Sequence, residues 1–163
     1  MALFPSAPGG GQEVAHGYKG KGVLLHFVTD SNGRPIAVDS TAADGNEREV
    51  AKKMLTDLRT HRFSEKFAFV EADRGYDSEK LRSALLGLKY FPLIFWRKFR
   101  TVTDRPTTRE MFDLFRIASQ RWKIERFFSI IKRKYRRLLM RWERLQLSWL
   151  SFCKLALIAF WLF

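Results

Sequence analysis

The chain has 163 residues, of which 46% are hydrophobic and 15% aromatic, a composition that excludes intrinsic disorder and provides for the core of one domain. Lys and Arg number 30 against 17 Asp and Glu. The resulting charge of +13 favours a polyanionic partner, nucleic acid before membrane, with a merely basic surface as the alternative. The single cysteine, Cys153, excludes an internal disulfide and is typical of a reducing compartment, so we expect a cytoplasmic protein with Cys153 in its core.

The first half of the chain predicts a loop, a hairpin and a helix. Residues 1–22 are rich in glycine and are expected to form an N-terminal loop. The apolar run at residues 22–30 predicts a buried strand, and the returning strand is expected at residues 35–41. An Asn-Gly pair at positions 32 and 33 lies between them, which is the strongest short-range signal for a hairpin. A helix is predicted at residues 47–59, after a polar cap at Asp44 or Asn46.

The second half predicts further strands and helices in alternation. A strand is expected at residues 67–72, a short helix from Asp77 or Ser78 to residue 86, and a strand at residues 91–96. Two helices follow: a long one from Thr107 or Thr108 to about Tyr135, and one at residues 145–162. This order predicts an α/β fold in which a mixed sheet is flanked by helices within one domain.

The last helix is apolar enough to raise the question of a membrane span. Polar residues interrupt it, among them Gln146, Ser151 and Lys154. A span needs about 20 predominantly apolar residues with interfacial anchors on both sides. A buried terminal helix is therefore predicted, with no membrane partner.

Asp73 is the first candidate for chemistry. It lies at the carboxyl end of a predicted buried strand, where open α/β sheets place their ligands, and Gly75 allows a sharp turn behind it. The alternative is a cap of the following helix, a role for which Asp77 and Ser78 are better placed. Glu71 would point to the same side of the strand and could serve as a spare acidic ligand.

Glu125 is the second candidate, inside the long helix. At about 100° per residue, Arg121, Glu125 and Lys132 share one face, beside the apolar stripe that should pack on the sheet. The alternative is an ordinary ion pair between Arg121 and Glu125, worth a few tenths of a kcal/mol. Two carboxylates on so basic a chain indicate metal-dependent chemistry on a nucleic-acid backbone.

The same helix carries most of the clustered positive charge. Residues 116–144 contain 11 Lys or Arg against 2 Glu. This density predicts a DNA-binding surface, with a solvated basic face as the alternative. The residues proposed to contact DNA are Arg121, Lys132, Arg133, Lys134, Arg136 and Arg137.

Several blocks of the chain, in this order and spacing, resemble the DDE transposases of bacterial insertion sequences. Residues 17–26 and 30–35 look like the second and third strands of that family, and residues 42–48 look like its next loop. The block Ala-Asp-Arg-Gly-Tyr-Asp-Ser at residues 72–78 resembles the one that carries the second catalytic Asp. The block from Arg121 through Glu125 to Lys132 resembles the one that carries the catalytic Glu.

The resemblance implies a ribonuclease H-like fold, with residues 23–163 forming the C-terminal part of the catalytic domain. It implies that Asp73 and Glu125 bind Mg²⁺ or Mn²⁺ for DNA strand cleavage and strand transfer at the ends of an insertion sequence. Arg121 and Lys132 would contact phosphates near the scissile bond. The partners it implies are the transposon ends and the target DNA, bound by a homo-oligomer.

Two departures from the family pattern qualify this expectation. Ala118 stands where the family has a tyrosine, and residues 1–16 contain no Asp that could be the first catalytic carboxylate. We therefore expect the first strand to be missing or incomplete, as in an N-terminally truncated transposase. The first alternative is a catalytically dead DNA-binding remnant, and a weaker one is a membrane-associated basic protein that uses its C-terminal helix.

Overall fold

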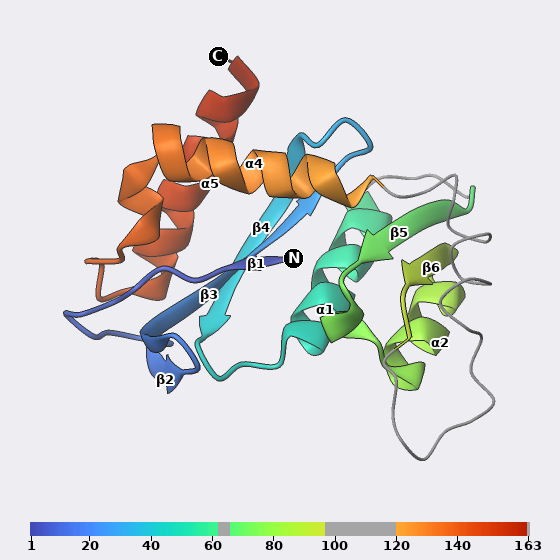
Figure 1. Ribbon diagram of the computed structural model, residues 1–163, viewed down its shortest axis with the longest axis horizontal. Coiled ribbons are helices and arrows are strands. Elements are labelled where there is room, and N and C mark those ends of the chain that lie inside the picture. The colour runs from blue at the N-terminus through green and yellow to red at the C-terminus, as the bar shows by residue number, and fades with distance from the viewer. Residues whose placement is uncertain (62–65, 97–119, 163) are drawn as a thin grey trace.

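The computed structural model describes residues 1–61, 66–96 and 120–162. Within these residues the fold is mixed α/β, as predicted, and its strands form two separate sheets (Figure 1). The strands are β1 Ala2–Leu3, β2 Ala15–Gly17, β3 Gly20–Thr29, β4 Pro35–Ala42, β5 Ala68–Ala72 and β6 Tyr90–Ile94. The helices are α1 Glu47–His61, α2 Glu79–Gly87, α4 Arg121–Lys134 and α5 Gln146–Leu162, with short 3-10 turns η1 Arg74–Tyr76 and η2 Arg136–Leu139.

The antiparallel hairpin of β3 and β4 is the centre of the larger sheet, and it confirms the prediction from the Asn-Gly pair. Its turn is held by the Asp30 side chain, whose Oδ1 accepts hydrogen bonds from the backbone N of Asn32 at 2.9 Å and of Arg34 at 2.8 Å. Gly33 has a φ of +80°, a conformation that glycine adopts without a steric penalty. The turn chemistry therefore sets the register of the longest strand pair.

The N-terminal segment is more ordered than the loop expected for residues 1–22. Two short strands, β1 and β2, pair antiparallel with β3 on opposite sides, β1 with Leu25 and His26 on the side away from β4 and β2 with the first residues of β3, before the β4 pairing begins. A long central strand leaves a row of N–H and C=O groups on each side, and these groups need hydrogen-bond partners. The sequence did not predict these strands, because strands of two and three residues are too short to show an alternating apolar pattern.

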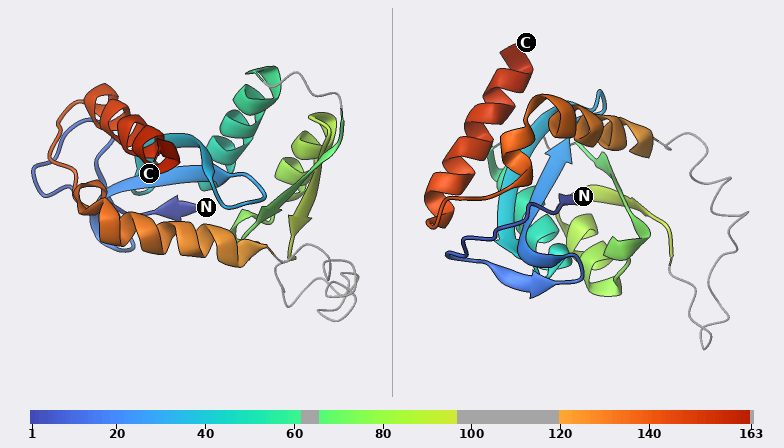
Figure 2. Two further views of the ribbon diagram at one scale, coloured as in Figure 1. Left: turned by 90° about the horizontal axis from the view of Figure 1, so that it is seen from above. Right: turned by 60° about the vertical axis from the view of Figure 1, so that its left-hand side comes forward.

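The second sheet consists of β5 and β6, which pair in parallel from Ala68↔Tyr90 to Ala72↔Ile94. Helix α2 connects them and packs with α1 around a small core. No ladder among the described strands joins this pair to the larger sheet, so the single mixed sheet expected from the sequence is divided in two. Figures 1 and 2 show β1 in the space between β3 and β5.

Helices α4 and α5 cover one face of the β3–β4 hairpin and build the main core there. Phe27 of β3 meets Phe127 and Phe128 of α4 edge to face, with ring centroids 5.1 and 5.7 Å apart. Such aromatic pairs add about 0.5–1.5 kcal/mol to the effect of burial alone. This contact fixes the position of α4 on the sheet.

The terminal helix α5 is buried on one side only. Trp149, Cys153 and Leu157 face the core, whereas Leu147 and Leu155 are exposed. The prediction of a buried Cys153 is confirmed, and burial raises the pKa of its thiol to about 12. Among the described residues, none of the helices combines the length and the apolar character needed to cross a membrane.

The predicted elements agree with the described ones to within about two residues at most ends. The expected start of the long helix at Thr107 or Thr108 and the family position at Ala118 lie outside the described residues. The described part of that helix is α4, which begins at Arg121 and ends at Lys134, one residue before the predicted end.

The tip of the hairpin docks on α4, and this contact yields a test. A Cβ placed on Gly33 would meet the Lys123 side chain at 3.1 Å, and the Lys123 Nζ donates a hydrogen bond to the Ser31 carbonyl. Gly33→Ala should therefore lower the free energy of unfolding by about 1–2 kcal/mol, through the left-handed φ and the close contact. Urea denaturation followed by circular dichroism measures the change.

The matched control is Gly9→Ala, where an added Cβ meets nothing within 4 Å and φ is not in the left-handed range. This substitution should change stability by less than about 0.5 kcal/mol. Equal effects of the two substitutions would show that the hairpin tip does not constrain α4.

Candidate active site

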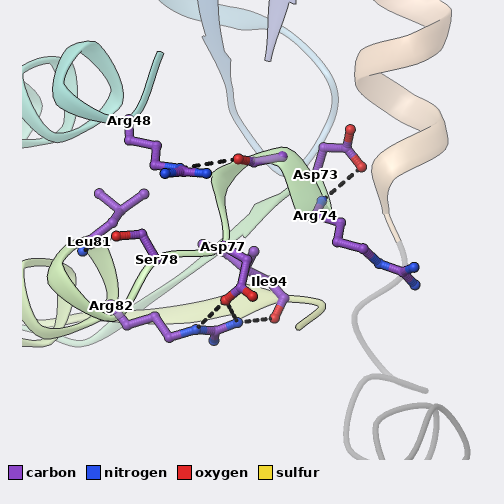
Figure 3. Close-up of polar contacts among 9 residues, drawn as sticks. Arg48, Asp73, Arg74, Asp77, Ser78, Leu81, Arg82 and Ile94 are labelled. Atoms are coloured by element: carbon purple, nitrogen blue, oxygen red, sulfur yellow. Dashed lines mark hydrogen bonds and ion pairs between the residues drawn. The ribbon is translucent and has the colours of Figure 1, made fainter. Parts of the chain in front are cut away.

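Asp73 directly follows β5 and turns the chain into η1. Its Oδ1 accepts a hydrogen bond from the backbone N of Arg74 at 2.8 Å, which caps the 3-10 turn (Figure 3). The cap of α2 is Ser78, as the sequence suggested, with its Oγ 3.5 Å from the Leu81 backbone N. Asp73 therefore combines a local capping bond with a partly exposed position at the carboxyl end of a strand.

Arg121 connects Asp73 with Glu125. Its Nη1 lies 2.7 Å from Asp73 Oδ1, and its Nε lies 3.2 Å from Glu125 Oε1. The exposed fraction of the side chain is 41% for Arg121, 42% for Asp73 and 51% for Glu125, so solvent reaches all three. The expected pair of Arg121 and Glu125 exists, but the same guanidinium also binds a carboxylate from the end of β5.

Glu71, considered as a spare acidic ligand, has a different contact in the structure. Its Oε2 accepts a hydrogen bond from the backbone N of Gln120 at 2.9 Å, immediately before α4 begins. Glu71 and Asp73 thus both hold the first residues of α4 against the end of β5. The two contacts join residues that lie far apart in the sequence.

A buried ion pair supports this end of β5 from below. Arg82 of α2 lies 3.0 Å from the Asp77 carboxylate, and it also donates to the Ile94 carbonyl at the end of β6 (Figure 3). The Arg82 guanidinium stacks over the Trp96 ring, 4.2 Å from its centroid. Asp77, proposed as a helix cap, binds Arg82, and Arg82 joins α2 to β6 behind the Asp73 turn.

Buried polar groups beside Asp73 had no signal in the sequence. The Met1 ammonium donates to the Phe27 carbonyl, and burial lowers its pKa to about 6 against the opposing effect of Glu47 and Asp73. Burial raises the pKa of Tyr76, and the Glu47 carboxylate raises it further. These groups come from four distant segments, so no local spacing could have revealed them.

Asp73 and Glu125 form a donor pair that fits a divalent metal ion. Mg²⁺ is commonly bound by one or two carboxylates, with water and substrate phosphate completing its shell. Both carboxylates already converge on one cationic group and are open to solvent. In the described part of the chain, however, no group of three or more His, Cys, Asp or Glu is arranged to hold a metal.

The residues predicted to bind DNA differ in how they are engaged. Arg121 is bound by both carboxylates, and Arg137 donates to the Met140 carbonyl and the Glu143 carboxylate. Four residues are exposed and form no ion pair within the described residues: Lys132, Arg133, Lys134 and Arg136. These four extend from the last turn of α4 into η2, at the end opposite Glu125.

Comparison with known families supports the resemblance of these blocks. The family described as the transposase DDE domain matches residues 5–161. The chain belongs to the DDE transposase family. The match contains both carboxylates, Arg121 and the whole basic segment, so the expectation from the sequence blocks is confirmed at the level of the family.

Two relatives of the chain are putative transposases of insertion sequence elements. One, for IS402 of Burkholderia cepacia, is 32% identical over 125 residues, which are 73% of this chain and 53% of the relative. The chain thus matches about half the length of that protein. The other, for IS6501 of Brucella ovis, is 27% identical over 139 residues, or 85% of this chain and 96% of the relative. No solved structure matches the chain.

The buried pair of Arg82 and Asp77 should stabilise the Asp73 turn far more than an exposed pair would. Asp77→Asn should lower the free energy of unfolding by about 3–5 kcal/mol, because it leaves the Arg82 charge buried without its counterion. Chemical denaturation measures this loss.

The control is a pair that also involves α2 but is exposed, between Lys80 and Glu49 at 3.0 Å. Glu49→Gln should have a far smaller effect, because solvent screens the exposed pair. If both substitutions had similar small effects, the buried pair would not be the support of the Asp73 turn.

Proposed function

We propose that this DDE transposase domain cleaves and joins DNA at the ends of an insertion sequence, with Asp73 and Glu125 as metal ligands. The observation that supports the proposal is the guanidinium of Arg121, which bonds both carboxylates although they come from β5 and α4. Two carboxylates that converge at the end of a strand, beside a basic helix, suit phosphoryl transfer on a polyanion.

The metal ion proposed for this position is Mg²⁺ or Mn²⁺, and when bound it would supply the activation of a water or 3′-hydroxyl and stabilisation of the leaving oxygen. Asp73 and Glu125 would hold it. Arg121 has a second role, since its charge stabilises the two carboxylates next to each other before any other cation is present. When DNA is bound, Arg121 and Lys132 would contact phosphates near the scissile bond.

We further propose that the two sheets are parts of one ribonuclease H-like sheet. Residues 23–163 would then form the C-terminal part of the catalytic domain. The antiparallel pair β3–β4 and the parallel pair β5–β6 fit that arrangement if one strand between β3 and β5 joins them. Among the described residues, β1 pairs with β3 at this position from Ala2↔His26 to Leu3↔Leu25, and Ser6 adds an isolated bridge to Gly22. A longer strand there is where the first carboxylate of the family would lie.

The second candidate function is that of a DNA-binding remnant without catalytic activity. It is favoured by one observation: within the described residues, Asp73 and Glu125 are not part of a group of three possible metal ligands. A DNA-nicking assay with Mn²⁺ on insertion-sequence ends separates the two functions. Cleavage that Glu125→Gln abolishes supports the transposase, whereas binding without cleavage supports the remnant.

For both candidates the proposed partner is DNA, including element ends and target, bound in the cytoplasm by a homo-oligomer of this chain. The exposed cations from Lys132 to Arg136 supply the positive surface. Neutralising phosphates with such side chains releases counterions, which provides affinity that depends steeply on salt.

Metal binding can be tested without cleavage. Asp73→Asn and Glu125→Gln should each abolish Mn²⁺ binding in a calorimetric titration. Arg121→Met should strengthen it about five- to tenfold, because it removes a competing cation whose partly exposed bonds are worth about 1 kcal/mol.

Glu79→Gln is the control for a lost acidic charge, since Glu79 is exposed in the first turn of α2. It should leave Mn²⁺ binding unchanged. Unaltered binding after Asp73→Asn or Glu125→Gln would exclude these residues as ligands.

The basic segment is tested by the dependence of duplex DNA binding on salt. Replacing Lys132, Arg133 and Arg136 with Ala should reduce the slope of log K against log salt by about 2–3, at about 0.9 per lost phosphate contact. Fluorescence anisotropy between 50 and 200 mM salt, roughly the range over which such slopes are resolved, provides the measurement.

Lys53→Ala with Lys80→Ala is the control, because both lysines already pair with carboxylates, Asp39 and Glu49. That variant should keep the slope of the unaltered chain. A slope that is unchanged in the first variant would mean that the basic segment is only a solvated face.

A further inference from the structure

A groove of about 460 Å³ lies between the end of α4 and the last turns of α5, away from the two carboxylates. It is lined by Ile130, Arg133, Lys134, Tyr135 and Phe160. Figures 1 and 2 show the two helices side by side at this end of the molecule. The volume lies within the range of pockets that bind small organic groups, which is about 300–1,000 Å³.

The two aromatic rings of the groove are held in place by the core. Phe160 packs edge to face on the buried Phe127, with ring centroids 5.3 Å apart. Tyr135 ends α4 through a hydrogen bond from its backbone N to the Ile131 carbonyl at 2.9 Å, and it packs against the same core. Both side chains remain partly exposed, so each presents ring surface at a fixed position.

The two cations of the groove carry charge that no described carboxylate neutralises. Arg133 and Lys134 are exposed, and neither forms an ion pair within the described residues. Arg137 nearby is different, because Glu143 binds its guanidinium. The groove therefore combines aromatic surface with unneutralised positive charge.

Aromatic surface next to positive charge matches the two parts of a nucleotide. Bases stack on aromatic side chains with an energy that depends little on sequence, and phosphates bind Arg and Lys. A base within a duplex is already stacked on its neighbours and cannot enter such a groove without leaving the stack. The shape and charge of the groove thus favour an unpaired nucleotide over duplex DNA.

We propose that the groove between α4 and α5 binds one unpaired nucleotide of the DNA, with its base on Tyr135 and Phe160 and its phosphate on Arg133 and Lys134. This rests on the proposed function, because it assumes that DNA is the partner. The 12 residue steps from Arg121 to Arg133 correspond to about 18 Å along α4, so the groove would hold DNA at a distance from the Asp73 end of the helix. It would distinguish a frayed or single-stranded end from a closed duplex.

The test compares two DNA ligands of equal duplex length by fluorescence anisotropy. One has blunt ends, and the other ends in a short single-stranded overhang. The unaltered chain should bind the overhang ligand about tenfold more tightly, as expected when a single base stacks on protein. Abasic residues in the overhang should remove this preference, because they keep the phosphates and lose the bases.

Variants of the rings should change the preference and leave duplex affinity nearly unaltered. Tyr135→Leu removes one ring at similar volume and should reduce the preference severalfold, whereas Tyr135→Phe keeps the ring and should preserve it. Arg133→Gln with Lys134→Gln should weaken binding of both ligands. Lys154 is exposed on α5 and does not line the groove. Lys154→Gln should therefore leave the preference for the overhang ligand unchanged.

The outcomes separate this proposal from the proposed function. Salt-dependent binding of both ligands with equal affinity would overturn the nucleotide groove and leave DNA binding intact. A preference that survives Tyr135→Leu in a chain with an unchanged circular dichroism spectrum would also overturn it. No binding of either ligand would overturn both proposals.

Discussion

The position of α4 on the sheet depends on the packing of Phe127 and Phe128 against Phe27, and the carboxylate site depends on the position of α4. The bonds from Arg121 to Asp73 and Glu125 are partly exposed and are worth about 1 kcal/mol or less each. Burying one phenylalanine side chain contributes about 1.5–3 kcal/mol, and the core here buries several. Aromatic packing therefore brings α4 to the end of β5, and the ion pairs then align the side chains.

Buried and exposed interactions also differ in energy next to the Asp73 turn. The exposed pair between Lys80 and Glu49 contributes little, whereas breaking the buried pair between Arg82 and Asp77 would leave a charge without water or counterion. The turn that carries the proposed metal ligand Asp73 is thus supported by an interaction that is costly to break. The Asp73 turn is anchored to α2 and β6 through this pair, which is independent of the main core.

The positively charged side chains at the two ends of α4 are in different settings. At its first turn, Arg121 is neutralised by two carboxylates, which suits a position where a metal and a phosphate would compete for the same groups. At its last turn, Lys132, Arg133 and Lys134 form no ion pair within the described residues, which suits contact with a polyanion. One helix would thus connect the proposed chemistry with the proposed recognition of DNA, and its rigidity would hold the two about one helix length apart.

The sequence by itself determined the local elements and the family. Turn chemistry at Asp30 and Gly33 specified the hairpin, and helical spacing on the long helix placed Arg121 and Glu125 together, because both signals depend on neighbours in the chain. Only the tertiary structure decided which distant groups meet. Arg121 binds Asp73 as well as Glu125, Glu71 binds the start of α4, and Arg137 is engaged by Glu143. The division of the predicted sheet also had no local signal, since pairing between distant strands depends on which edge each strand finds in the folded chain.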